Sequence, residues 1–311
     1  MNEIILHQYP ASPFAEKIRA ILGYKGLAWR AVEIPLVMPK PDLTALTGGY
    51  RRTPVLQIGC DVYCDTPLIA RVLEARCAEP RLFHPSQAAT AHAAGRFFDR
   101  ELFLSAISQL FDPAVAPSSA EALGGAEMTA AFAADRTRMM SNTPVRPPRY
   151  TDGRVVVGQV LGQLEAQLGA GGPFLFGEHV GWADFCAYHP VWALRRNRVL
   201  VRRLDPYLHV LAWLDRMSAF GHGNSKPFSA EGALDIARRS EPEARAAESA
   251  RFERANLGDE VEVAANDYAL EPSTGRLVHV GPDELVIERH DERAGRVCVH
   301  FPRIGFKVKS L

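Results

Sequence analysis

The chain has 311 residues, which is more than one small domain usually holds, so we expect two or three compact units. Apolar residues make up 47% and charged residues 23%, as in an ordinary globular protein. Because 36 basic side chains balance 36 acidic ones, charge gives no reason to expect nucleic acid or an anionic membrane as a partner.

The five cysteines are scattered and contain no C-x-x-C pair, and no Cys/His set has the spacing of zinc ligands. This usage predicts reduced thiols in a cytosol-like compartment and no metal site. The N-terminal residues lack the basic and apolar regions of a signal peptide, and no apolar run reaches transmembrane length. We therefore expect a cytoplasmic protein without a membrane span.

Strand and helix signals alternate over the first eighty residues. An apolar run at residues 4–7 predicts a strand, and apolar side chains at helical spacing predict a helix over residues 13–24. A second strand, a hairpin and a last helix are then expected at residues 28–34, around 59–61 and from 66 onward. The order β-α-β, loop, β-β-α predicts an α/β domain spanning residues 1–80.

The remaining chain divides into three parts by composition. Residues 88–225 are alanine-rich and carry amphipathic runs, which predict an all-α domain. Residues 226–257 are charged and predict a helical connector. Five short apolar runs separated by turn signals over residues 258–311 predict a small, partly closed β-barrel. The expected fold class is therefore α+β multidomain, with an α/β domain, an all-α helical domain and a small all-β barrel at the C-terminus.

The stretch SPF places Ser12 and Pro13 at the start of the first expected helix. Serine at the cap followed by proline is a common way to begin a helix, so a purely structural role is one interpretation. The alternative is chemical, because a helix N-terminus carries free N–H groups and a partial positive charge that stabilise an anion. A thiolate held there would also receive a hydrogen bond from the Ser12 hydroxyl.

Two later segments have the same ambiguity. Thr53 precedes Pro54 at the start of an expected strand, where a cis peptide bond would leave the Thr53 backbone available to an extended peptide. Asp65 and Thr66 begin the last helix of the first domain and are suited either to capping it or to holding an ammonium and a carboxylate. The residues alone leave both interpretations open at each position.

Taken together, SPF, then TPV, then DT resemble the cytosolic glutathione transferase family, over residues 1–220 approximately. The resemblance implies a thioredoxin-like first domain followed by an all-helical domain. The SPF start is similar to the serine-type, tau-like classes, whereas omega-like enzymes carry cysteine there. The stretch FGEHVGWADF also resembles the family's buried helix start, with Asp184 in place and Gly181 at the cap position.

The family resemblance further implies roles for individual residues. Ser12 would be the catalytic residue that stabilises the glutathione thiolate. Thr53 would pair with the peptide backbone, and Asp65 with Thr66 would take the γ-glutamyl end. Arg52 would lie near the glycine carboxylate. The implied glutathione-binding residues are Phe14, Arg52, Thr53, Pro54, Asp65 and Thr66, and the implied wall of the second-substrate pocket is Tyr9, Phe98 and Leu102.

The resemblance predicts a cytoplasmic, homodimeric detoxification enzyme that transfers the glutathione thiolate to a small electrophilic or apolar substrate without a metal. One alternative is a glutathione-dependent isomerase, dehalogenase or thiol reductase of the same fold, although serine at position 12 disfavours the reductase. The other is a non-catalytic binding or regulatory protein whose β-barrel meets a partner. Neither nucleic acid nor a membrane is expected as a partner.

Overall fold

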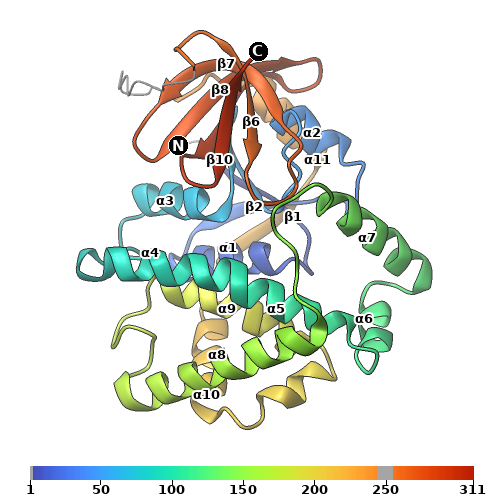
Figure 1. Cartoon of the computed structure of the whole chain (residues 1–311). Helices are drawn as coiled ribbons and strands as arrows, with labels where there is room; N and C mark the ends of the chain where they lie inside the picture. The colour runs from blue at the N-terminus through green and yellow to red at the C-terminus, as the bar shows by residue number, and fades with distance from the viewer. Residues whose placement is uncertain (1–2, 244–254) are drawn as a thin grey trace.

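The computed structural model of the chain describes residues 3–243 and 255–311. Its first unit is the thioredoxin-like α/β domain that the sequence predicts (Figure 1). Its strands, in chain order, are β1 (Ile4–Gln8), β2 (Ala28–Glu33), β3 (Val55–Ile58) and β4 (Asp61–Cys64). Strand β1 lies between β2, to which it is parallel, and β3, to which it is antiparallel. The helices are α1 (Pro13–Tyr24), α2 (Pro41–Thr47) and α3 (Thr66–Arg76).

The second unit is the expected all-α domain, which lies below the sheet in Figure 1. A π-helical turn (Phe98–Leu102) joins its first two helices, and several single 3-10 turns link others. The helices are α4 (Ala88–Phe97), α5 (Phe103–Ser108), α6 (Ala116–Ala122), α7 (Ala126–Met139), α8 (Tyr150–Gly171), α9 (Trp182–Arg196) and α10 (Leu208–Ala219). Helix α9 buries Tyr188 against Trp213 and Phe185 against Phe220, so the core of this domain forms around it.

Helix α9 begins within the stretch FGEHVGWADF, with Gly181 at the cap position. The Asp184 carboxylate accepts hydrogen bonds from the Gly181 amide at 3.0 Å, the Leu175 amide at 2.9 Å and the Trp213 indole at 2.9 Å. Glycine has no side chain to cap the helix, so Asp184 supplies the reciprocal contact alone. This buried carboxylate therefore ties α9 to α10 and to the loop before α9.

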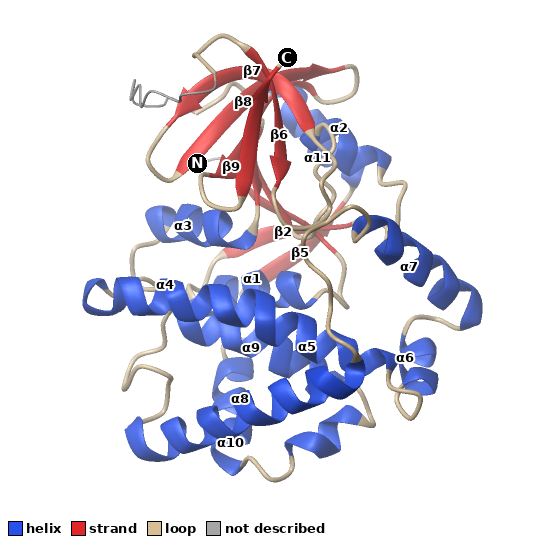
Figure 2. Cartoon of the chain, in the orientation of Figure 1, coloured by secondary structure: helices blue, strands red, loops and turns tan. Residues whose placement is uncertain are grey.

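The C-terminal strands form the expected extra β module, but its shape differs from the small barrel that we predicted. They continue the sheet of the first domain, because β9 pairs in parallel with β4. The full strand order is β10-β6-β7-β8-β9-β4-β3-β1-β2-β5, an open arrangement in which β10 lies at the edge. Figure 2 shows the strands of the module, in red, at the top of the molecule. The module's strands are β6 (Glu260–Ala265), β7 (Ser273–Val280), β8 (Glu284–Asp291), β9 (Gly295–Pro302) and β10 (Phe306–Ser310).

The predicted helical connector at residues 226–257 is only partly helical in the structure. It contains α11 (Ala230–Arg239), but its first residues belong to β5 (Asn224–Phe228), which pairs in parallel with β2. The sequence of β5, NSKPF, does not indicate a strand, because Pro227 cannot donate a ladder hydrogen bond. The proline is tolerated because β5 is the exposed edge strand of the sheet. Residues 244–254 of the predicted connector lie outside the described residues.

The first domain contributes to two hydrophobic cores, one on each face of its sheet. Along β1, Leu6 packs into the core shared with the helical domain, while Ile5 packs into the core shared with the β module. Successive strand side chains point to opposite faces, so a strand buried on both faces is apolar throughout. The β module is therefore part of the packing of the first domain.

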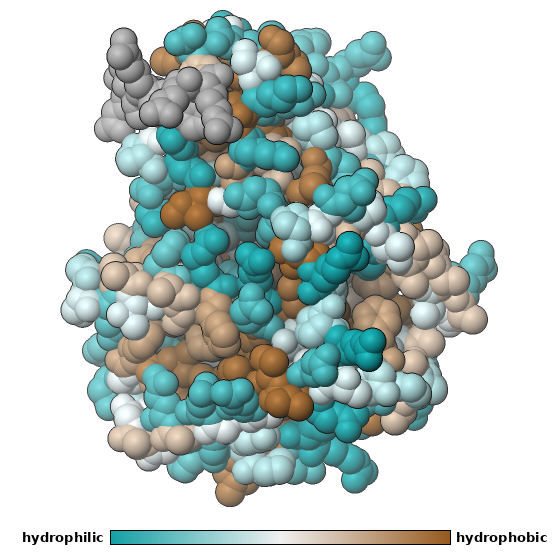
Figure 3. Space-filling view, in the orientation of Figure 1, coloured by the Kyte–Doolittle hydropathy of each residue, from teal (hydrophilic) through white to brown (hydrophobic). Residues whose placement is uncertain are grey.

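Polar contacts reinforce the seam between β4 and β9. The Cys298 amide donates to the Cys60 carbonyl at 3.0 Å. His300 lies between two acids, with Nε2 at 2.9 Å from Asp61 Oδ1 and Nδ1 at 3.0 Å from Glu284 Oε2. In Figure 3 the β module is largely hydrophilic on its outer face, whereas apolar side chains gather over the helices below it. The apolar interior of the module faces the first domain.

Candidate functional site

The SPF stretch begins α1, and its first residue, Ser12, caps the helix. Ser12 has extended backbone angles, and its Oγ accepts a hydrogen bond from the Ala15 amide at 3.2 Å. The side chain is almost wholly buried, at 3% exposure. A hydroxyl oxygen that accepts from the backbone keeps its own hydrogen to donate. The capping interpretation and the chemical one are thus compatible in one geometry.

Thr53 and Pro54 directly precede β3, and the peptide bond between them is cis. Thr53 is half-buried, and its Oγ1 accepts a hydrogen bond from Lys40 Nζ at 3.3 Å. A lysine amine therefore lies beside the residue whose backbone is expected to pair with a peptide.

Lys40 is a site residue that the sequence analysis missed. It is 3% exposed at the start of α2, and its Nζ lies 5.5 Å from the centroid of the Tyr9 ring. Among the described residues it has no ion-pair partner. Burial, with the nearby charges of Arg136 and Arg51, lowers the pKa of Lys40 to about 7. A lysine between two prolines gives no sign in the sequence that its amine will be buried.

Asp65 and Thr66 form the start of α3. The Asp65 Oδ1 accepts from the Thr66 amide at 2.8 Å, and Asp65 has φ of 72°, in the left-handed region that non-glycine residues rarely adopt. The Thr66 hydroxyl is buried and has no hydrogen-bond partner among the described residues. Burial raises the pKa of Asp65, although the charge of Arg52 opposes the shift. A strained cap beside an unpaired hydroxyl is typical of a ligand-binding site.

Arg52 is held by the C-terminal module. Its Nη2 donates to the Asp267 carboxylate and to the Tyr268 carbonyl, and its guanidinium carbon lies 4.0 Å from the centroid of the Tyr268 ring. Its Nη1 is 3.9 Å from Asp65 Oδ2. The structure therefore brings Arg52 together with the acid at the start of α3, and it adds two residues that the sequence did not associate with the site.

Of the predicted second-substrate residues, Phe98 and Leu102 share one core, and Tyr9 packs against another. Tyr9 packs against the core of the β module, and its hydroxyl accepts from Arg136 Nη2 at 3.3 Å. Phe98 and Leu102 belong to the core of the helical domain, at 8% and 0% exposure. Phe14, on α1, is half-buried, and its ring is tilted against those of Phe103 and His189, with centroids 4.6 and 4.5 Å away.

A buried polar cluster that the sequence analysis did not find lies behind Phe14. Lys17 pairs with Asp99 at 2.7 Å, and His189 Nε2 is 2.9 Å from the same carboxylate. Burial lowers the pKa of His189 to about 4, so its ring is neutral near neutrality. The pKa of Asp99 is lowered, because the Lys17 charge and the His189 hydrogen bond outweigh its burial. The ion pair is thus Lys17 with Asp99, and it fixes α1 against the helical domain.

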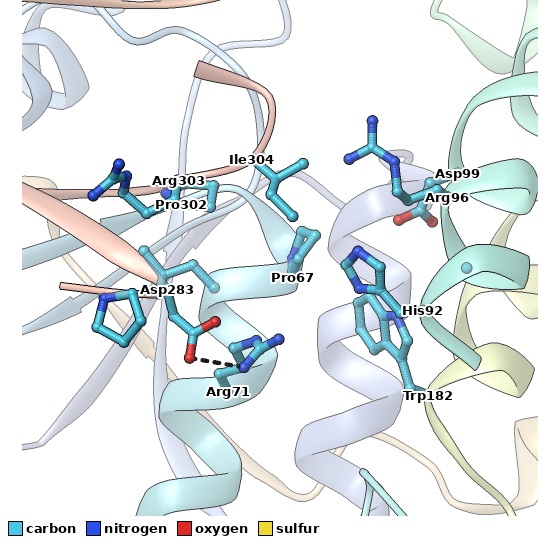
Figure 4. A pocket seen from close by; sticks show the side chains of 13 residues that line it. Pro67, Arg71, His92, Arg96, Asp99, Trp182, Asp283, Pro302, Arg303 and Ile304 are labelled. Carbon is cyan, nitrogen blue, oxygen red and sulfur yellow. Dashed lines mark ion pairs between the residues drawn. The ribbon is translucent and has the colours of Figure 1, made fainter. Parts of the chain in front are cut away.

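A separate pocket lies where α3, α4 and the β module meet (Figure 4). On one side Arg71 pairs with Asp283 at 3.1 Å. The other side is lined by His92 and Asp99. None of the predicted site residues lines it. Among residues 3–243 and 255–311 there is no group of three potential metal-ligating side chains, and no helix there is long and apolar enough to cross a membrane.

Comparisons with known proteins agree with the fold. Residues 6–81 match the profile of the glutathione S-transferase N-terminal domain, and residues 147–216 match that of the C-terminal domain. The crystal structure of a GST-like protein from Pseudomonas syringae has a TM-score of 0.83 and 40% identity, with 100% of both chains covered. That coverage includes the β module. A comparison with curated protein sequences found no match.

More distant structures share the fold alone. The tau-class glutathione S-transferase from mango, Mangifera indica, has a TM-score of 0.51 and 18% identity, covering 70% of this chain and 89% of its own. A glutathione S-transferase from Rhodospirillum rubrum F11 has a TM-score of 0.53 and 17% identity, covering 70% of this chain and 88% of its own. The two matched profiles and the Pseudomonas structure show that the chain belongs to the glutathione S-transferase family.

Proposed function

We propose that this protein is a glutathione-dependent transferase that passes the glutathione thiolate to a small electrophile. The observation that carries the proposal is Ser12, which caps α1 through its oxygen while its hydroxyl hydrogen is available to an anion at the helix N-terminus. The finer predictions of a homodimer, a cytoplasmic location and a role in detoxification remain expectations from the resemblance.

Polar side chains at the starts of α2 and α3 are suited to the polar groups of a short acidic peptide. Lys40 is a buried amine without an ion-pair partner among the described residues, and it suits a carboxylate. The Thr66 hydroxyl is buried and unpaired in the same set, beside the Asp65 carboxylate. A buried polar group without a partner carries a free-energy cost that a ligand can remove. These groups fit the two charged ends of glutathione.

The mechanism that follows assigns one task to each residue. Glutathione supplies the nucleophilic sulfur. Lys40 holds one carboxylate, the Thr53 backbone pairs with the peptide, and Asp65 with Thr66 holds the α-amino acid end. Ser12 donates to the sulfur, assisted by the N-terminal N–H groups of α1. A hydrogen bond to a charged group contributes about 1.5–3 kcal/mol, which lowers the pKa of the thiol by about one to two units.

The experiment is a comparison of two cap variants. Ser12→Ala removes the proposed donor, and Ser229→Ala removes the same kind of cap from α11, where Ser229 Oγ accepts from the Gly232 amide at 3.0 Å. With glutathione and an activated aryl chloride such as chlorodinitrobenzene, we expect Ser12→Ala to lower kcat/KM about 10- to 100-fold, and Ser229→Ala to leave it unchanged.

Calorimetry with glutathione completes that experiment. The wild-type protein and both variants are expected to bind the peptide, because Ser12 acts on the sulfur while other residues hold the two ends. Binding without turnover on a panel of electrophiles would contradict the transferase and support the binding protein. Equal activity in Ser12→Ala and Ser229→Ala would reduce Ser12 to a helix cap.

A further inference from the structure

The loop between β6 and β7, residues 266–272, lies directly on the segment that leads to Thr53. Arg52 is enclosed by it: Asp267 accepts from Nη2 on one edge, and the Tyr268 ring covers the guanidinium face at 4.0 Å. The Tyr268 amide in turn donates to Asp267 Oδ1 at 2.8 Å, which fixes the carboxylate. Arg52 therefore has one face and one edge occupied by the β module.

Other contacts hold this loop in place without the help of Asp267. The Ala269 amide donates to the Met139 carbonyl at 2.9 Å, and Glu271 pairs with Arg51 at 2.9 Å. At its end, Ser273 Oγ accepts from the Tyr50 amide at 3.2 Å. Because three anchors already fix the loop, the contacts of Asp267 and Tyr268 with Arg52 are not needed to close it.

Close packing at Gly49 further restricts the loop. A Cβ atom at this position would come within 2.1 Å of the Pro272 carbonyl oxygen, and Gly49 has φ of 152°. The two backbones approach so closely that only glycine fits there. The loop is thus built against the segment before Thr53, as a fixed wall of the site.

The charges at this wall do not balance. Arg52 carries one positive charge, whereas Asp65 and Asp267 carry two negative charges, and both carboxylates lie beside the guanidinium. The nearby Lys17 is already paired with Asp99. The surplus of one negative charge favours a ligand group that brings an ammonium to this position.

Donor atoms for the accompanying carboxylate are also present. Arg52 Nε is buried without a hydrogen-bond partner among the described residues, and so is the Thr66 hydroxyl. An ammonium beside a carboxylate is the α-amino acid group, which glutathione carries at its γ-glutamyl end. The site has acceptors and donors for both halves of that group.

We propose that Asp267 and Tyr268 complete the subsite for the α-amino acid end of glutathione, so that the C-terminal β module forms part of the peptide site. The Tyr268 ring positions the Arg52 guanidinium toward the ligand carboxylate. Asp267 fixes the same guanidinium and provides the surplus charge that selects the ammonium. This inference rests on the proposed function, because it names further residues of the same glutathione site.

Calorimetry with two peptides tests the role of Asp267. Glutathione carries the ammonium, and its deaminated analogue lacks only that group. The variants are Asp267→Asn and, as a matched control from the same loop, Glu271→Gln. We expect Asp267→Asn to weaken glutathione binding about tenfold and to change the affinity for the deaminated analogue little. Glu271→Gln should leave both affinities near the wild-type values, and Asp267→Glu should restore glutathione binding.

Three other results of these binding measurements would overturn the inference. An equal loss of both peptides in Asp267→Asn would show a merely structural role and overturn the inference. Tighter glutathione binding in that variant would also overturn it, because the loop would then compete with the ligand. A wild-type protein that binds neither peptide would overturn the proposed function itself, and the inference with it. Thermal unfolding of each variant verifies that its fold is intact.

Discussion

At the scale of single residues, the site combines positions that the sequence reveals with others that it hides. The starts of α1 and α3 could be predicted because serine, aspartate and threonine before helical runs have a local signature. Lys40 could not, because its burial depends on contacts with residues far along the chain, among them the Tyr9 ring. Local sequence patterns thus predict helix caps, whereas long-range packing decides which charged side chains become buried.

The lowered pKa of Lys40 leads to a prediction about proton uptake. With a pKa of about 7, lowered first by burial, the amine is mostly neutral at about pH 8 and becomes charged when a carboxylate binds beside it. Binding of S-methylglutathione, which has no thiol proton, should then take up a large fraction of one proton at about pH 8.

Calorimetry in buffers of different ionisation enthalpy measures that uptake. We expect it in the wild-type protein and expect its loss in Lys40→Met, together with weaker binding. Below pH 7 the amine is already charged, so the uptake should fade as the pH is lowered. Binding enthalpies that are the same in all buffers at about pH 8 would contradict the assignment of Lys40.

At the scale of elements, α7 of the helical domain contacts the segment before Thr53, and the buried Asp135 is one of its anchors there. Asp135 is fully buried, pairs with Arg51 at 2.5 Å and accepts from the Met38 amide at 3.3 Å. The sequence around α7 shows only a weakly amphipathic helix, so neither its docking nor the Arg51 pair could be predicted. The position of this helix is set by polar contacts, this buried ion pair among them, rather than by an apolar stripe.

Removing that acid should weaken the docking of α7. Asp135→Ala leaves Arg51 with Glu271 as its ion-pair partner at a site that is otherwise buried, and we expect the free energy of unfolding to fall by about 3–5 kcal/mol. Glu127→Ala, at an exposed position of the same helix, should change it by less than about 0.5 kcal/mol. Urea denaturation measures both, and equal effects of the two substitutions would contradict this account of α7.

At the scale of the whole molecule, the β module and the first domain share one sheet and one core. The sequence predicts the strands of the module correctly because they alternate and end in turn signals. It does not predict their partner, since the parallel pairing of β9 with β4 joins segments more than two hundred residues apart. Closing five strands into a small barrel would satisfy their edges within the module. In the structure, β9 instead pairs with the edge of β4 and extends the sheet of the first domain.

Phe301 tests whether the two parts unfold together. It is fully buried in the shared core, with ring centroids 6.1 Å from Tyr50 and 5.3 Å from Phe306. Phe301→Ala should lower the free energy of unfolding by about 3–5 kcal/mol, whereas Ile304→Ala, at 58% exposure, should change it by less than about 0.5 kcal/mol.

Hydrogen exchange followed by mass spectrometry shows where Phe301→Ala acts. We expect faster exchange in β3 and β4 as well as in β8 and β9, because they form one cooperative unit. Faster exchange confined to the β module would show that the module is an independent domain.

Ser12 is proposed to activate a bound thiol, and the ultraviolet absorbance of the glutathione thiolate during a pH titration tests this role most directly. In the wild-type complex the pKa of the thiol should lie about one to two units below that of free glutathione, and in the Ser12→Ala complex it should return close to the free value. The same thiol pKa in both complexes, with glutathione bound to each, would contradict the claim.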